Sequence, residues 1–171
     1  MGKALTTPVQ HHQYLSFVLD DEEYGVNILL VQEIRGWESV KPIPNAPKFI
    51  AGVINLRGHV IPIVDMRKRF GLPDKPYTKT TVVIYVTVTN TEGQQVLGMI
   101  VDSVADVYDI SDHDRRPCPD IVGAVDKQFL ESMAIKGEKV IAIIDVNHMF
   151  EQQVLSDFIS STTRSNSNIG E

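Results

Sequence analysis

The chain has 171 residues, of which 43% are hydrophobic, so most of it can bury a core, and disorder is excluded for the bulk of the sequence. Its net charge of -6 argues against a binder of duplex nucleic acid, because contact with phosphates requires a basic face. One cysteine excludes an internal disulfide, and no hydrophobic run matches a membrane span or a signal peptide, so we expect a cytoplasmic protein without membrane insertion.

The first half of the chain consists of short runs of alternating or β-branched hydrophobic residues separated by turn residues. These runs predict strands over 14–19, 24–28, 31–34, 53–56 and 59–64. Arg57-Gly58 separates the last two, and Gly58 can adopt the positive φ that a tight hairpin turn requires. Asp65 then predicts the N-cap of a short helix that ends at Phe70.

The second half also consists of short hydrophobic runs separated by turn residues. Hydrophobic runs predict strands over 80–87, 96–101 and 141–144, with a hairpin turn over 134–140. Asp102 predicts the cap of a short turn over 103–106, and Asp145 the cap of a longer helix whose apolar stripe runs from Phe150 to Ile159. The polar ends, 1–12 and 160–171, predict loose segments.

The sequence repeats itself. Residues 61–65 (IPIVD) recur as 141–145 (IAIID), an offset of 80, and Phe49 and Phe70 match phenylalanines at the same offset. Arg57-Gly58 matches Lys136-Gly137 at an offset of 79, which implies that the second copy lacks one residue. Upstream, residues 24–26 match 97–99 and residues 33–34 match 106–107, both at an offset of 73.

Each copy holds about five strand-like runs at short spacing, which is typical of a small barrel. A unit of that size is marginally stable alone, so we expect the two copies to pack over a shared core. The junction between them would then form a groove for a ligand or a partner.

A catalytic function finds little support in the motifs. The sequence contains no glycine-rich phosphate loop, no Cys/His set with metal spacing and no nucleophile elbow. Asp65 and Asp145 could be read as the paired carboxylates of a hydrolase, but the repeat favours two helix caps. A sensor that binds an apolar ligand in the groove is a second alternative. We predict a protein that is not an enzyme and that uses no cofactor or metal.

Three segments carry a family resemblance: residues 21–25 (DEEYG), 31–36 (VQEIRG) and 52–58 (GVINLRG). With residues 60–65 (VIPIVD), Val101-Asp102 and Arg116-Pro117, they resemble the CheW-like family of bacterial chemotaxis coupling proteins over roughly residues 14–158. The resemblance implies an all-β fold of two SH3-like five-stranded β-barrels with short helices and a C-terminal helix. Its barrels would span 14–76 and 77–158, with terminal strands allowed to cross over, and flexible tails would cover 1–13 and 160–171.

The resemblance also implies a function. Proteins of this family are adaptors that join methyl-accepting chemoreceptors to the histidine kinase CheA and so control its autophosphorylation. CheA itself and the CheV adaptors carry the same module with further domains, for which this chain has no room. We therefore expect a cytoplasmic adaptor that is recruited to membrane-associated receptor arrays.

Receptor contact in this family is placed in the groove between the barrels. By the matching motifs, the receptor-binding residues would be Val31, Glu33, Arg57 and Val60. The two valines supply apolar area, and the two charged residues supply specificity. The alternatives are that the valines belong to the barrel core and that Arg57 is a solubilising turn residue, since Lys136 stands at the matching turn.

Kinase contact is placed at the outer ends of the barrels. On the first barrel the candidates are Pro42, Ile43 and Pro44, and on the second they are Arg116 and Ile121. Trp37 stands near the same end of the first barrel and could be an exposed interface anchor or a core residue.

Overall fold

Strands make up most of the computed structural model, which describes residues 11–90, 93–119, 121–122 and 125–150. The first half contains β1 (His11–Leu19), β2 (Glu22–Asn27), β3 (Val31–Gly36), β4 (Ile50–Leu56) and β5 (His59–Asp65). The second half contains β6 (Val82–Asn90), β7 (Gly93–Val101), β8 (Ser103–Ser111), β9 (Arg115–Arg116), β10 (Ile121–Val122), β11 (Val125–Asp126), β12 (Leu130–Lys136) and β13 (Lys139–Ile144). The described helices are short: α1 (Met66–Arg69), α2 (Val146–Met149), and the 3-10 turns η1 (Ile28–Leu30), η2 (Asp112–Asp114) and η3 (Lys127–Phe129).

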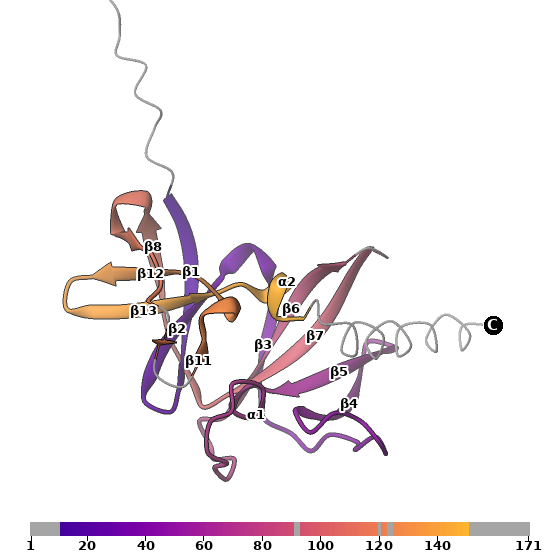
Figure 1. Cartoon of the computed structure of the whole chain (residues 1–171). Coiled ribbons are helices and arrows are strands. Elements are labelled where there is room, and N and C mark those ends of the chain that lie inside the picture. The colour runs from indigo at the N-terminus through magenta and orange to yellow at the C-terminus, as the bar shows by residue number, and fades with distance from the viewer. Residues whose placement is uncertain (1–10, 91–92, 120, 123–124, 151–171) are drawn as a thin grey trace, which may run out of the picture.

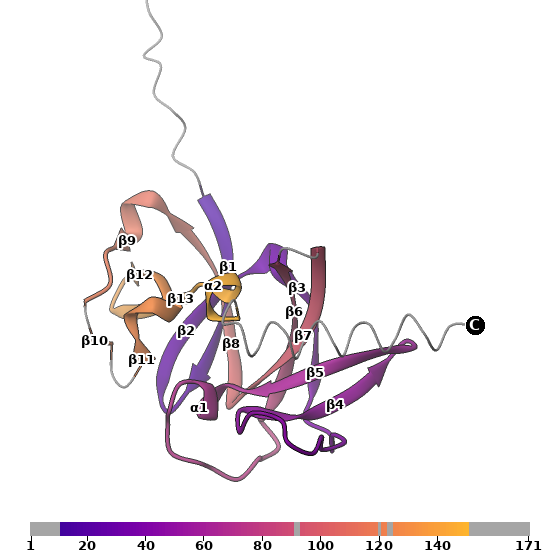
Figure 2. The same ribbon diagram turned by 45° about the vertical axis from the view of Figure 1, so that its right-hand side comes forward.

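The strands form two large curved sheets that lie side by side (Figures 1 and 2). The first barrel has the order β3-β6-β7-β5-β4, and the second has the order β8-β1-β2-β13-β12-β9. The prediction of an all-β fold with two barrels is confirmed. The second barrel has six strands instead of five, because the two-residue strand β9 adds to the edge of β12.

Each barrel takes strands from both halves of the sequence. The β1–β2 hairpin pairs with β8 and β13 of the second half, and β6 and β7 pair with β3 and β5 of the first half. A division at residues 76 and 77 therefore does not separate the two sheets. Local periodicity predicts where a strand lies, but it carries no information on which distant strand becomes its partner.

The β4–β5 and β12–β13 hairpins show the repeat directly. Leu56 pairs with His59, and Lys136 pairs with Lys139, so the offset of 80 holds through both turns. A register shift occurs at the same place in each, between Ile50 and Gly52 and between Leu130 and Ser132. The offset of 79 is therefore wrong: no residue is missing, and the structural counterpart of Arg57 is Gly137 rather than Lys136.

A core shared by both barrels confirms the expected packing of the two copies. Four aromatic rings cross it in sequence, Phe17 to Tyr24, Tyr24 to Phe70 and Phe70 to Phe129, with ring centroids 5.5–6.0 Å apart. Each barrel also has its own interior cluster. The first interior contains Leu56, Ile61, Ile63, Val83, Tyr85 and Ile100, and the second contains Tyr14, Ile110, Ala134, Ile141 and Ile143.

Both predicted aspartate caps are present. The Asp65 carboxylate accepts hydrogen bonds from the backbone N–H groups of Arg67 and Lys68, and the Asp145 carboxylate accepts one from His148. α2 ends at Met149 with Phe150 as its C-cap, and the rest of the predicted stripe, as far as Ile159, lies outside the described residues. The tails from 1 to 10 and from 160 to 171 lie outside them as well.

Two local predictions are wrong. β1 begins at His11, because His11 and His12 pair with β8 instead of belonging to a loose segment. Asp102 caps no turn, because β8 begins at the next residue. The Asp102 carboxylate instead accepts hydrogen bonds from Arg67 Nε (2.8 Å), Arg67 Nη2 (2.7 Å) and the backbone N–H of Asp20 (2.9 Å).

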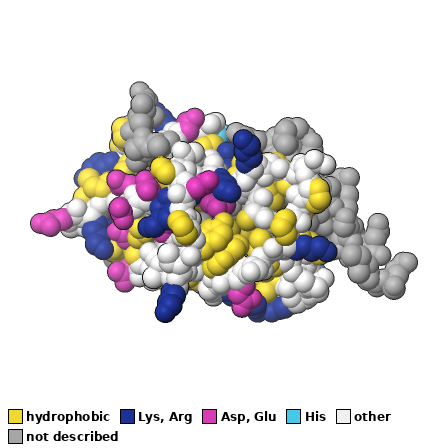
Figure 3. Space-filling model, turned by 90° about the horizontal axis from the view of Figure 1, so that it is seen from below, with side chains coloured by type: hydrophobic (Ala, Val, Ile, Leu, Met, Phe, Trp, Pro, Cys, Tyr) yellow, Lys and Arg dark blue, Asp and Glu magenta, His cyan; other side chains and the backbone are white. Residues whose placement is uncertain are grey.

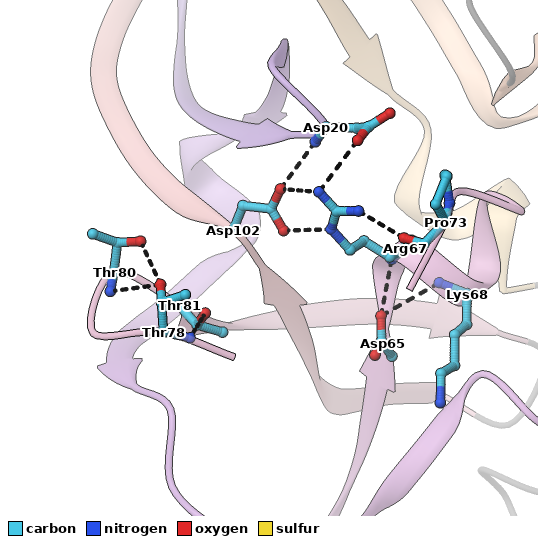
Figure 4. Close-up of polar contacts among 9 residues, drawn as sticks. All are labelled: Asp20, Asp65, Arg67, Lys68, Pro73, Thr78, Thr80, Thr81 and Asp102. Atoms are coloured by element: carbon cyan, nitrogen blue, oxygen red, sulfur yellow. Dashed lines mark hydrogen bonds and ion pairs between the residues drawn. The ribbon is translucent and has the colours of Figure 1, made fainter. Parts of the chain in front are cut away.

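Arg67 is the centre of an ion cluster that ties distant segments together (Figure 4). Its side chain is only 7% exposed, and it contacts Asp102, Asp20 and the carbonyl oxygen of Pro73. Burial acts to raise the pKa of Asp102, but the hydrogen bonds from Arg67 and Asp20 outweigh it and hold that pKa below its usual value. The cluster joins the β1–β2 turn of the second barrel to α1 of the first.

Candidate functional site

A hollow of about 500 Å³ opens at one end of the first barrel. It is lined only by residues of the first barrel, whereas the sequence predicted a groove between the two barrels. The lining residues are Gln32, Glu33, Leu56, Arg57, His59, Val60, Ile61, Thr87, Gln94, Gln95 and Val96. Three of the four predicted receptor-binding residues, Glu33, Arg57 and Val60, are therefore brought together.

An ion pair crosses between the two edge strands of this barrel. Glu33 lies on β3, Arg57 follows β4, and these strands stand at opposite ends of the sheet order. Glu33 Oε2 accepts a hydrogen bond from Arg35 Nε (2.8 Å), and Glu33 Oε1 lies 3.1 Å from Arg57 Nη1. The hydrogen bond from Arg35 and the charge of both guanidinium groups hold the pKa of Glu33 below its usual value.

The backbone conformation at Arg57 explains why its side chain is exposed to solvent. Arg57 and Gly58 form the two-residue turn between β4 and β5, with φ of 54° and 85°, and the Asn55 side chain accepts a hydrogen bond from the Gly58 N–H. Residues other than glycine rarely adopt a positive φ. The Arg57 side chain is 73% exposed, so it points to solvent and supports no core.

The two valines differ. Val60 is half-buried on β5 and lines the hollow, whereas Val31 packs against the core between the barrels. The position of Val31 agrees with the alternative that this valine belongs to the core. Val60 instead lies where a partner could contact it.

Sequence reasoning missed several residues of the hollow. Gln32 Nε2 donates a 2.6 Å hydrogen bond to Thr87 Oγ1 across β3 and β6, and Arg35, which lies outside the lining, is the second partner of Glu33. Gln95 is buried, and its Oε1 atom has no hydrogen-bond partner among the described residues. The strand register places Thr87 and Gln95 at the hollow, but that register can be used only once the pairing of β6 and β7 is known.

The predicted kinase-binding residues lie outside the hollow. Pro42, Ile43 and Pro44 follow Lys41, whose backbone bridges to Val53 of β4, and both prolines are exposed. A proline-containing loop supplies no N–H groups at those positions, so it ends the pairing along this edge.

The remaining candidates lie on β9, in the separate β10–β11 pair and just after β3. Arg116 is exposed on β9 and donates from Nη1 to the carbonyl oxygens of His113 (2.7 Å) and Arg115 (2.8 Å). Ile121 begins β10, where it pairs with Asp126. The Trp37 ring is half-buried, and its centroid lies 4.2 Å from the centroid of the Tyr77 ring. Trp37 is therefore neither fully exposed, as an interface anchor would be, nor fully buried in the core.

The described part of the chain was also searched for a metal site, a membrane-spanning helix, a reactive cysteine and a pair of carboxylates. No three His, Cys, Asp or Glu side chains are placed to hold a metal ion there, and none of its helices is long and apolar enough to cross a membrane. Burial raises the pKa of the Cys118 thiol. Asp65 and Asp145 serve as caps of separate helices.

The surface is charged unevenly. Seen from below (Figure 3), acidic and basic side chains gather toward the left of the view, the side on which the second barrel lies in Figure 1. Hydrophobic side chains spread over the middle of the same face.

Comparison with known proteins gives one consistent result. A family model described as "CheW-like domain" matches residues 13–154. The chain is 37% identical to the chemotaxis protein CheW of Klebsiella aerogenes, over 88% of this chain and 89% of that protein, and 37% identical to that of Rhizobium meliloti, over 82% and 88%. Its structure resembles that of the scaffolding protein TtCheW from Thermoanaerobacter tengcongensis, with a TM-score of 0.76 and 34% identity over 85% and 96%.

Proposed function

The chain belongs to the CheW-like family of chemotaxis scaffolding proteins, and from this premise we propose that it is a non-catalytic adaptor that couples chemoreceptors to the kinase CheA. In this role it contributes binding free energy and geometry, while the phosphoryl chemistry belongs to the kinase. It is recruited from the cytoplasm to receptor arrays at the membrane.

The observation that carries the proposal is the Arg57 turn. Its guanidinium is held at the rim of the hollow by a strained two-residue turn and by Glu33, and it supports no part of the core. Beside it, Leu56, Val60 and Ile61 offer apolar area. A helical tip of a receptor that carries apolar and acidic side chains is complementary to such a surface.

We assign kinase contact to residues outside the hollow. Pro42, Ile43 and Pro44 on the first barrel, with Arg116 and Ile121 on the second, would let one adaptor meet two kinase domains. Their separation from the hollow supports simultaneous binding of receptor and kinase, because neither partner would then cover the other's contacts.

The test is charge reversal at Arg57. Arg57→Glu should weaken binding to a receptor cytoplasmic fragment by more than about 1 kcal/mol, at least about fivefold in Kd, because a negative charge would then face the acidic side chains of the proposed receptor tip. Binding to the CheA regulatory domain and the melting temperature should stay unchanged, because exposed positions rarely affect stability. Glu138→Arg, in the equivalent turn of the second barrel, is the matched control and should leave receptor binding intact.

Each outcome has one interpretation. Loss of receptor binding alone supports the assignment of the hollow. Loss of both partners with a lower melting temperature would mean that Arg57 is structural. Unchanged binding to both partners would make Arg57 a solubilising residue and would contradict the proposal for this surface.

A further inference from the structure

The helices α1 and α2 are counterparts in the repeat, and each reaches across to the other barrel. Their second residues are Arg67 and Asn147, which stand at the offset of 80. Arg67 contacts Asp102 and also Asp20, in the β1–β2 turn of the second barrel, and we name these contacts the α1 clamp. Asn147 contacts Thr89 on β6 of the first barrel, and we name this contact the α2 clamp. In Figures 1 and 2, α2 lies above α1, so the clamps stand at different levels of the junction.

The two clamps hold equivalent backbone groups. β1 and β6 pair with the counterpart strands β2 and β7 in matching register, so Asp20 and Thr89 occupy the same position of their hairpins. The Asp20 N–H donates to Asp102 Oδ2, and the Thr89 N–H donates to Asn147 Oδ1, each at 2.9 Å. A comparison of these two amides therefore compares the two clamps directly.

The α1 clamp is ionic and largely shielded from water (Figure 4). The Arg67 side chain is 7% exposed, and its Nε and Nη2 donate to the two oxygens of the Asp102 carboxylate. Its Nη1 donates to the carbonyl oxygen of Pro73 at 2.6 Å. Two parallel hydrogen bonds between a guanidinium and a carboxylate fix the angle of the pair as well as its distance. This side of the junction therefore resists rotation of one barrel against the other.

The α2 clamp is neutral and lies at the surface. The hydrogen bond from Thr89 to Asn147 joins exposed groups, and hydrogen bonds to ionised groups are roughly twice as strong as neutral ones. Residues 31–34 pair with β6 as residues 104–107 pair with β1, which makes Leu29 the counterpart of Asp102. Leu29 offers no carboxylate, and it is 80% exposed. The ion pair of the first clamp is therefore not reproduced in the second.

Arg69 lies between the two clamps. The carbon of its guanidinium group is 5.0 Å from the ring centroid of Phe49 and 4.4 Å from that of Phe129, and these phenylalanines are counterparts at the offset of 80. Contact with both counterparts places Arg69 near the axis that relates the two copies. Its Nη2 also donates to the carbonyl oxygen of Met149 at 2.8 Å. α1 thus supplies the side chains both of the strong clamp and of the contact at the axis.

We propose that the two barrels rotate slightly against each other about α1, so that the junction opens at the α2 clamp and stays closed at the α1 clamp. Opening at α2 breaks one exposed neutral hydrogen bond, whereas opening at α1 breaks a buried ion cluster, so the first motion requires less free energy. A partner that contacts both barrels would select one angle between them. The hinge is a property of the chain alone and does not depend on the proposed coupling of receptor and kinase.

The first experiment measures hydrogen exchange of the two clamp amides by NMR in the full chain. The protection factor, which corrects for the intrinsic exchange rate, should be at least about tenfold smaller at Thr89 than at Asp20, because the α2 clamp opens more often. Asn147→Asp gives the Thr89 N–H a charged acceptor and should raise its protection severalfold. The protection of the Asp20 amide should not change in this variant, which makes Asp20 the internal control.

The second experiment measures distances between spin labels attached to cysteines, in a Cys118→Ser background. Lys68→Cys with Asp21→Cys spans the α1 clamp, and the counterpart pair, His148→Cys with Gln94→Cys, spans the α2 clamp. All four positions are exposed. The distance distribution across the α2 clamp should be at least about twofold wider than that across the α1 clamp.

Variants of Arg67 test whether the ion cluster is the cause. Arg67→Met should widen the distribution across the α1 clamp toward that of the α2 clamp. Arg67→Lys, which keeps the charge but loses the paired hydrogen bonds, should widen it less and serves if Arg67→Met does not fold.

The label distances decide the outcome. Equal widths across the two clamps, or a wider distribution at α1, would overturn the proposal even if the amides differ, because fraying at the end of β6 would then explain fast exchange at Thr89. No change in width on substitution of Arg67 would overturn it as well. Neither experiment contains a receptor or a kinase, so failure of the hinge leaves the proposal for Arg57 untouched.

Discussion

The two barrels have the same strand arrangement but present different open ends. In the first, Glu33, Arg57 and Val60 surround a hollow. In the second, Lys139 holds the strand position of His59, and its Nζ lies 2.9 Å from Tyr108 Oη and 3.8 Å from Glu23 Oε2. The counterpart of Val60 there, Val140, is 52% exposed.

The difference teaches which repeated residues serve the fold. Both copies keep an aspartate cap, Asp65 or Asp145, because the start of the helix needs an acceptor, and both keep a glycine, Gly25 or Gly98, because neighbouring side chains leave no room for a Cβ. Where Arg57 stands in one copy, the other has Gly137, the residue that the turn itself prefers. A position that departs from the structurally favoured residue in one copy alone is a strong candidate for function.

The largest expected difference in stability between the copies concerns the residue two positions after each aspartate cap, Arg67 after Asp65 and Asn147 after Asp145. Arg67→Met should lower the free energy of unfolding by about 3 kcal/mol, because it leaves Asp102 without its buried partner. The side chain of the counterpart Asn147 accepts a hydrogen bond from the Thr89 N–H at 2.9 Å, so Asn147→Ala should cost about 1 kcal/mol. Urea denaturation of both variants measures the two values, and equal losses would contradict the comparison.

The same variant has a pH signature. Because Asp102 has a lower pKa in the folded state than in the unfolded state, its contribution is complete above about pH 4 and is lost as the pH falls through the folded value. The stability gap between the parent and Arg67→Met should therefore narrow in acid. A gap that is constant from pH 7 to pH 3 would mean that packing, and not the ion cluster, accounts for the loss.

The two equivalent glycines should respond unequally to alanine. A Cβ at Gly98 would lie 2.6 Å from Ile63 Cδ1 and 2.7 Å from Val83 Cγ1, whereas at Gly25 the nearest atom is Ile143 Cδ1 at 2.9 Å. An isoleucine Cδ1 can turn away, but a valine methyl group cannot do so without repacking. Gly98→Ala should cost about 2 kcal/mol and Gly25→Ala less, by thermal denaturation. The reverse order would show that the second barrel is the more tightly packed.

The smallest effect on stability is expected at the hairpin turns. Arg57→Gly should change the free energy of unfolding by less than about 0.5 kcal/mol, because relief of the positive φ is offset by the flexibility of glycine in the unfolded chain. Gly137→Arg should cost about 1 kcal/mol, because it introduces a side chain at a φ of 61°. Chemical denaturation distinguishes them, and a loss at Arg57→Gly larger than at Gly137→Arg would mean that Arg57 stabilises the fold.

The sequence was sufficient for the strands of the first half, for the caps at Asp65 and Asp145 and for the offset of 80, but it predicted turns over 103–106 and 134–140, where β8 and the end of β12 lie. Alternating hydrophobic residues and the spacing of Asp65 and Asp145 are local signals, and they were read correctly. The family motifs led to Glu33, Arg57 and Val60, which the structure brings to one hollow. Whether these residues bind a receptor remains a prediction.

Other features depend on contacts between distant segments. The role of Asp102 was missed because its partner, Arg67, lies 35 positions earlier and no local pattern joins them. Gln95 and Thr87 reach the hollow only because β6 and β7 pair with strands of the first half. The offset through the turn was misread because a shared Gly-containing pattern was matched in place of the strand register.

The exchange of strands between the copies sets an order of events during synthesis. Tyr24 of β2 pairs with Ala142 of β13, so the ribosome must add roughly 120 residues, over about 6–24 s at typical rates, before that contact can form. Until then one edge of the β1–β2 hairpin has no strand beside it. The nascent chain therefore depends on Glu22 and Glu23 along β2, whose charges disfavour pairing with the same strand of a neighbouring chain.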